Sequence, residues 1–200
     1  KGLKNLFKII SESNKNIINL DLSYNSFGIN EFNVLIEYFK TKPILNSLDI
    51  SGNKLDLKSS VNLGAVLSSV KNIKSINMSN MNINCDTTPI LFKSFNSDEI
   101  ILDDNPLEEV GHIMLSKALA GNKNLKKLSL KNTKLSSIGL INLLGVLGKI
   151  KDFKELHLEN NEIDDLGMTT LMTTIKSNPY KIFVSKDKIN NELFKDNVLG

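Results

Sequence analysis

Apolar residues recur along this chain in one short pattern, which the stretch ILNSLDISGNKL at 44–55 represents well. Two alternating apolar residues, Leu48 and Ile50, are followed by Asn53 and then by a further apolar residue, Leu55. An apolar period of two predicts a short β-strand with one face turned inward. The pattern occurs six times, and its central apolar residues are Leu20, Leu48, Ile76, Ile100, Leu128 and Leu156.

The six copies are regularly spaced. Successive central residues lie 28, 28, 24, 28 and 28 residues apart, and a nearly fixed period of this size is typical of a solenoid. After each copy the apolar period changes to about four, as at Gly139, Leu143 and Leu147, which predicts a helix. Each repeat should therefore contain a strand, a turn and a helix. Strands pack about 4.8 Å apart and helices about 8 to 10 Å apart, so the stacked repeats should curve with the strands inside.

The consensus L-x-x-L-x-L-x-x-N-x-L resembles the leucine-rich repeat, and a 28-residue period with a helical second half is similar to the ribonuclease-inhibitor-like subclass of that family. The resemblance implies an α/β leucine-rich repeat solenoid, or horseshoe, with an inner parallel β-sheet, outer helices and about 28 residues per repeat. We expect a single domain over 1–200, with the helix of a partial repeat in 1–15 and six repeats in 16–177. Residues 178–200 should supply a last strand and a C-terminal cap. Because the chain begins with Lys1 rather than Met, we expect a fragment of a longer repeat array.

Four copies place an asparagine just after the strand, where its side-chain amide can bond the backbone of the turn. These asparagines are Asn25, Asn53, Asn105 and Asn161. Met81 and Thr133 occupy the same position in the other two copies, and because a methionine cannot form such bonds, we expect a local distortion at Met81. The same copy is four residues shorter before its next strand, so 84–98 should be the irregular point of the solenoid. Neutral drift or a change of curvature that shapes a binding surface would each explain it.

Composition narrows the classes of partner. The chain has a net charge of +3 and is 40% hydrophobic, which is enough to bury a core along one repeat array. Its basic residues are all lysines and it lacks Trp, which argues against a nucleic-acid partner, because arginine and aromatic side chains suit phosphates and bases. A single cysteine, Cys85, forms no internal disulfide and favours a cytoplasmic, intracellular location. The longest apolar stretch, 138–150, is too short to span a bilayer, so we expect no membrane partner.

Equivalent positions of neighbouring repeats should lie side by side on the concave face, where lysines alternate with acidic residues around Ile101 and His157. We predict that the partner-binding residues on this face are Glu99, Ile101, Asp103, Lys127, Lys131, Glu155, His157 and Glu159. Exposed ion pairs contribute only about 0 to 1 kcal/mol each, so they should orient a partner more than hold it. His157 lies between two glutamates without a third firm ligand or a nucleophile, and His112 aligns with apolar residues of other repeats. We therefore expect no catalytic residue, no metal site and no cofactor.

These features favour a protein–protein interaction module and not an enzyme. By resemblance, it would be the leucine-rich repeat part of a larger intracellular regulatory or scaffold protein, for example a CARMIL-type cytoskeletal regulator. One alternative is a protein similar to the activators of the Ran GTPase, although the arginine and the long acidic tail that this resemblance implies are not seen in the sequence. Another alternative is a structural spacer in a multidomain receptor or kinase. The expected partner is another protein and not a small-molecule substrate.

Overall fold

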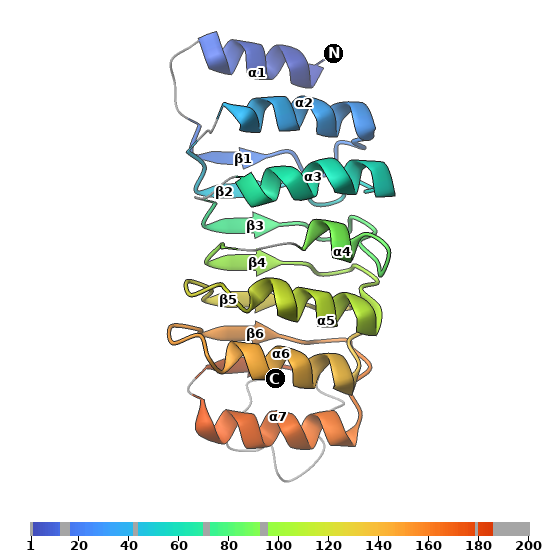
Figure 1. Ribbon diagram of the computed structural model, residues 1–200, viewed down its shortest axis with the longest axis vertical. Coiled ribbons are helices and arrows are strands. Elements are labelled where there is room, and N and C mark those ends of the chain that lie inside the picture. Colours follow the sequence, from blue (N-terminus) through green and yellow to red (C-terminus); the bar gives the residue numbers. More distant parts are fainter. Residues whose placement is uncertain are drawn as a thin grey trace.

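The computed structural model describes residues 2–12, 17–41, 44–69, 73–92, 96–178 and 180–185. Over these residues strands and helices alternate along the chain and stack into one elongated array (Figure 1). The chain therefore forms an α/β solenoid with the architecture expected for leucine-rich repeats, as the spacing of the apolar residues predicts. The predicted C-terminal cap falls on 186–200 and lies outside the described residues.

Each repeat contributes one strand of three residues to a single parallel sheet of seven strands in sequence order. The strands are β1 Asn19–Asp21, β2 Ser47–Asp49, β3 Ser75–Asn77, β4 Glu99–Ile101, β5 Lys127–Ser129, β6 Glu155–His157 and β7 Lys181–Phe183. The register joins equivalent positions, so Leu48 pairs with Leu20 on one side and with Ile76 on the other. The register expected from the six copies is confirmed, and β7 continues it.

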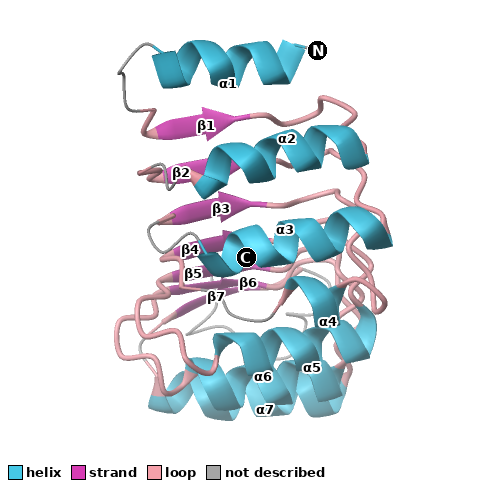
Figure 2. Cartoon of the chain, turned by 45° about the horizontal axis from the view of Figure 1, so that its top comes forward, coloured by secondary structure: helices cyan, strands magenta, loops and turns pink. Residues whose placement is uncertain are grey.

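The helices cover the side of the sheet opposite its free face (Figure 2). They are α1 Gly2–Glu12, α2 Ile29–Lys40, α3 Leu57–Ser69, α4 Thr88–Leu91, α5 Glu108–Leu119, α6 Ser137–Leu147 and α7 Asp165–Ser177. Each one packs against the next along the array. The strand side is the concave face of the solenoid and the helix side is the convex face.

The core lies between the sheet and the helices and runs the length of the array. The middle residue of every strand is buried in it, and these residues are Leu20, Leu48, Ile76, Ile100, Leu128, Leu156 and Ile182. The first and third residues of each strand point the other way, because side chains alternate along a strand. One residue of each strand therefore belongs to the core, and the other two residues lie on the concave face.

The asparagine positions do not all play the same part. Asn105 is fully buried, and its Oδ1 accepts hydrogen bonds from the backbone N–H groups of Met81 and Ile83, both at 3.0 Å. Its Nδ2 donates to the carbonyl oxygens of Met78 and Leu102, both at 2.8 Å. Asn53 lies two repeats before Asn105 and Asn161 lies two repeats after it, and both form equivalent bonds. Each of these amides therefore joins its own repeat to the preceding one.

The predicted distortion at Met81 is wrong. The residues on either side of it, Asn80 and Asn82, have φ values of 52° and 60°, and the residues flanking Asn25, where the asparagine is present, have 53° and 52°. The backbone therefore follows one path at both positions. The backbone N–H groups of Asn25, Met81 and Thr133 donate to the side-chain oxygen of the bridging asparagine in the next repeat. Their own side chains therefore need not bridge.

The shortened repeat is confirmed in its helix, because α4 has only four residues. It packs closely on α3, where Gly64 faces the backbone of Ile90. A Cβ built on Gly64 would lie 2.5 Å from the Ile90 carbonyl oxygen, which is backbone and cannot move aside as a flexible side chain can. Gly64 is thus the residue that lets α4 approach α3.

The variant Gly64→Ala should lower the free energy of unfolding by about 1 to 3 kcal/mol, because the added methyl group forces the two helices apart. Urea unfolding of dilute protein, followed by circular dichroism, measures the change. The matched control is Gly145→Ala in α6, where a Cβ has no neighbour within 4 Å. That variant should gain about 0.5 to 1 kcal/mol from its better helix propensity. Equal effects of the two substitutions would contradict the close approach.

Candidate functional site

The concave face is formed by three positions of each repeat: the first and third residues of the strand and the second residue after it. Equivalent positions form columns across the strands. In the column of third strand residues, Ile101 on β4 pairs with Ser129 on β5, and Ser129 pairs with His157 on β6. This geometry brings the eight predicted partner-binding residues together over β4–β6 and the residues just after them. Their role in binding stays a prediction.

The predicted alternation of lysines and acids forms ion pairs only in part. Lys131 Nζ lies 2.9 Å from Glu159 Oε1. Asp103 on the other side does not complete a ladder, because its Oδ1 accepts hydrogen bonds from Ser129 Oγ at 2.6 Å and from the backbone N–H of Lys131 at 2.9 Å. Lys127 forms no ion pair with another described residue, although it pairs in register with Glu99 and Glu155.

His157 stacks on an aromatic side chain that the site prediction omits. The ring of Phe183 on β7 lies 4.2 Å from the imidazole, with an angle of 6° between the planes. The imidazole Nε2 is 3.5 Å from Glu155 Oε2 and its Nδ1 is 3.7 Å from Glu159 Oε1. Within the described ranges, no group of three His, Cys, Asp or Glu residues could hold a metal ion. The alternation of buried Ile182 and Val184 already implies that Phe183 faces the concave side.

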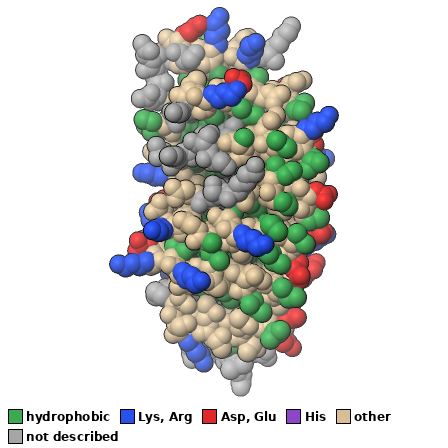
Figure 3. Space-filling model, viewed as in Figure 1, with side chains coloured by type: hydrophobic (Ala, Val, Ile, Leu, Met, Phe, Trp, Pro, Cys, Tyr) green, Lys and Arg blue, Asp and Glu red, His purple; other side chains and the backbone are tan. Residues whose placement is uncertain are grey.

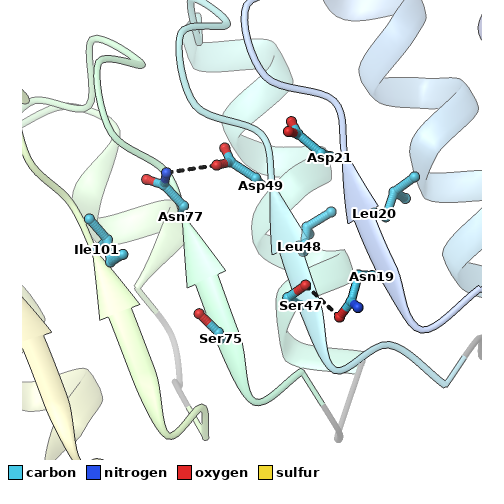
Figure 4. Close-up of a pocket in the computed structure, with 9 residues that line it drawn as sticks. All are labelled: Asn19, Leu20, Asp21, Ser47, Leu48, Asp49, Ser75, Asn77 and Ile101. Atoms are coloured by element: carbon cyan, nitrogen blue, oxygen red, sulfur yellow. Dashed lines mark hydrogen bonds between the residues drawn. The ribbon is translucent and has the colours of Figure 1, made fainter.

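The concave face is hollowed in its N-terminal half, over β1–β4 (Figure 4). The hollow has a volume of about 340 Å³. It is lined by Asn19, Leu20, Asp21, Ser47, Leu48, Asp49, Ser75, Asn77 and Ile101. The hollow forms because the first strand residues of β1–β3 have small side chains, an asparagine and two serines. Ile101 closes its C-terminal end as a half-buried apolar wall.

Two carboxylates lie in register in this hollow. Asp49 is well satisfied, because Oδ2 accepts from Asn77 Nδ2 at 2.8 Å and Oδ1 accepts from the backbone N–H and the hydroxyl of Ser51. The Oδ1 of Asp21 accepts from the backbone N–H of Ser23 at 2.9 Å, and the Ser23 hydroxyl also bonds this carboxylate. Hydrogen bonds from Ser23 lower the pKa of Asp21, so the carboxylate is held in its charged form.

The concave face has the opposite charge from the chain as a whole. Its acidic residues are Asp21, Asp49, Glu99, Asp103, Glu155 and Glu159, and its lysines are Lys127, Lys131 and Lys181. The chain overall carries +3. No lysine occurs among the concave positions of β1–β4, so the hollow has acidic residues without a neighbouring cation on that face. A concave surface with one sign of charge attracts ligands of the other sign.

Comparison with known proteins adds little to this geometry. No family model matches the chain, and no curated protein matches it. Among solved structures, the actin-binding site 2 (ABS2) of leiomodin-1 is similar over 86% of this chain and 87% of that chain, with 11% sequence identity and a TM-score of 0.49. A likeness of that size identifies no family and no function. No helix in the described part of the chain has both the length and the apolar character needed to cross a membrane.

Proposed function

We propose that this chain is a protein-binding module whose concave face binds a partner segment rich in Lys or Arg. The observation that supports it is the excess of carboxylates on the concave face of a chain with a net charge of +3. A fixed curved surface of this kind binds without first ordering itself, which limits the entropy lost on binding. Binding, without catalysis, is the proposed activity.

The hollow suits one basic side chain. Asp21 and Asp49 are paired residues of neighbouring parallel strands, so a cation between them would relieve the repulsion of two like charges. Ile101, two strands beyond Asp49 at the other end of the hollow, can contact an apolar part of a neighbouring partner residue. Partner groups beyond the hollow would meet Glu99, Asp103 and the remaining predicted binding residues toward β6.

We further propose, from the resemblance to leucine-rich repeats, that this module belongs to a larger intracellular regulatory or scaffold protein, of which a CARMIL-type cytoskeletal regulator is one example. In such a protein the solenoid would select the partner, while other segments would carry the regulatory activity. The charge of the concave face is the part of this proposal that can be tested on the chain itself.

The test is capture of partners from a lysate of the source cells, followed by measurement of Kd with the purified partner. The double variant Asp21→Asn/Asp49→Asn should weaken binding about tenfold or more, because it removes both charges and keeps the side-chain size. Ile101→Asn should weaken it, because it removes the apolar wall without adding a charge. Lys127→Glu/Lys131→Glu makes the C-terminal half more acidic and should strengthen binding.

The control variant is Glu37→Gln/Asp152→Asn, which changes the net charge by the same amount at exposed positions outside the concave face. It should leave Kd unchanged. Equal loss in the control would mean that only overall charge matters. Full affinity in both Asp21→Asn/Asp49→Asn and Ile101→Asn would refute binding at this face. Circular dichroism of each variant verifies that it is folded.

A further inference from the structure

A strip of exposed apolar side chains crosses the convex face over α5, α6 and α7. Val110, Ile138 and Leu166 occupy the same position of three successive repeats and are 50%, 53% and 64% exposed. Ile141 on α6 extends the strip, and Ile113 on α5 lies beside it half-buried. Figure 3 shows hydrophobic side chains gathered toward the N-terminal ends of the helices in this part of the molecule. Single exposed apolar residues are normal, but a row repeated at one position indicates a contact surface.

The middle helix of the strip has an unusual composition. Residues 137–147, SIGLINLLGVL, contain no charged residue, although Ile138, Ile141, Asn142 and Gly145 are exposed. A helix that is apolar on all sides normally lies inside a larger structure, whereas a surface helix has a charged outer side. The outer side of α6 is therefore suited to being covered.

Charges of opposite sign border the strip on its two long edges. Glu109 and Asp165 lie at the N-terminal ends of α5 and α7, and Lys117 and Lys176 lie near the C-terminal ends of the same helices. All four are exposed, and none forms an ion pair with another described residue. The surface thus consists of an acidic edge, an apolar strip and a basic edge, in that order along the helices.

We propose that the strip is the contact surface of a homodimer, in which a second copy of this chain covers it. A two-fold axis in the contact plane and parallel to the solenoid places α6 antiparallel to α6 of the second copy. The same rotation turns the acidic edge of each copy toward the basic edge of the other, so Glu109 approaches Lys117 and Asp165 approaches the more C-terminal Lys176 of the second copy. The surface is therefore complementary to itself, as an isologous contact requires. The dimer leaves the concave faces open, so it does not depend on the proposed partner binding.

Sedimentation equilibrium of the 200-residue chain over a range of concentrations tests the dimer. The apparent mass should rise from 22.3 kDa toward twice that value. Ile138→Asp/Ile141→Asp should raise the dimer Kd by about 100-fold or more, because each contact would bury four uncompensated carboxylates. The matched control is Leu57→Asp/Val61→Asp on α3, where the native residues are 53% and 52% exposed but lie outside the strip. The control should dimerise like the wild type.

Charge-reversal variants distinguish the proposed two-fold contact from nonspecific hydrophobic association. Lys117→Glu/Lys176→Glu alone and Glu109→Lys/Asp165→Lys alone should each dimerise more weakly than the wild type, because like charges then meet along both edges. An equimolar mixture of the two variants should dimerise again, because every acidic edge then faces a basic one. A mixture that stays monomeric would overturn the two-fold arrangement.

A wild-type chain that remains a 22.3 kDa monomer at every concentration would overturn the homodimer and assign the strip to a different protein. Dimerisation that survives Ile138→Asp/Ile141→Asp, or that is lost equally in the α3 control, would also overturn it. Circular dichroism of the variants excludes unfolding as the cause of a lost dimer.

Discussion

Replacing Asn105 by alanine should lower the free energy of unfolding by about 3 to 5 kcal/mol. The side chain is fully buried and forms hydrogen bonds of 2.8 to 3.0 Å to backbone groups of Met78, Met81, Ile83 and Leu102, which water cannot replace. Alanine would leave two N–H groups and two carbonyl groups without that partner at a junction between repeats. Urea unfolding measured by circular dichroism gives the loss.

The control is Asn25→Ala, the same residue type at the equivalent position of the first described repeat. Asn25 is exposed, and its side chain donates one hydrogen bond, to the carbonyl oxygen of Ser23. Its substitution should cost about 0.5 kcal/mol. Similar losses for Asn25→Ala and Asn105→Ala would contradict the assignment of the bridging role to alternate repeats.

The second large effect is a loss of stability in mild acid that depends on His112. Its imidazole is fully buried, with Nδ1 donating to the carbonyl oxygen of Glu108 and Nε2 lying 3.0 Å from Thr133 Oγ1. Burial lowers the pKa of His112 from its usual 6.5 to about 4, because the charged imidazolium loses its hydration. Below pH 6.5 the unfolded chain therefore takes up a proton that the folded chain does not, and this favours unfolding.

Stability should consequently be highest above pH 6.5, fall as the pH is lowered to about 4, and show no further effect of this group below that value. The total loss from His112 is roughly 3 to 4 kcal/mol, because a pKa lowered by about 2.5 corresponds to about 1.4 kcal/mol for each unit. The variant His112→Leu, which introduces the residue found at the equivalent Leu140, should remove this slope. Carboxylates with lowered pKa values, such as Asp21 and Asp164, lose their contribution only at lower pH, near and below 3.8. An unchanged slope in His112→Leu between pH 6.5 and 4 would refute the prediction.

Sequence periodicity predicted the stacking of the repeats well, because burial selects the apolar residues and a strand allows only every second one inside. Leu48, Leu128 and the added Ile182 all follow that rule. Periodicity could not predict which asparagines bridge two repeats, because each bridging hydrogen bond depends on the backbone of the preceding repeat as much as on the asparagine itself. The mistaken distortion at Met81 arose from assigning the bridge to every repeat.

The candidate site was predicted less completely. The alternating charges led us to predict binding residues over β4–β6. The hollow lies over β1–β4 and includes only Ile101 of the predicted binding residues. A hollow results from small side chains such as Ser47 and Ser75, and small residues give no distinctive signal in a sequence. The absence of lysines beside Asp21 and Asp49 became informative only once the register had placed the neighbouring columns.

The central claim is that the concave strand face binds a basic protein segment. Nuclear magnetic resonance of the isotope-labelled chain, titrated with the captured partner, tests it most directly. We expect the backbone amide signals of β1–β4 and of the neighbouring concave residues to shift first and most, with Asp21 and Asp49 among them, and the outer helix residues to change little. Shifts confined to α2–α7, with the strands unchanged, would contradict the proposed function.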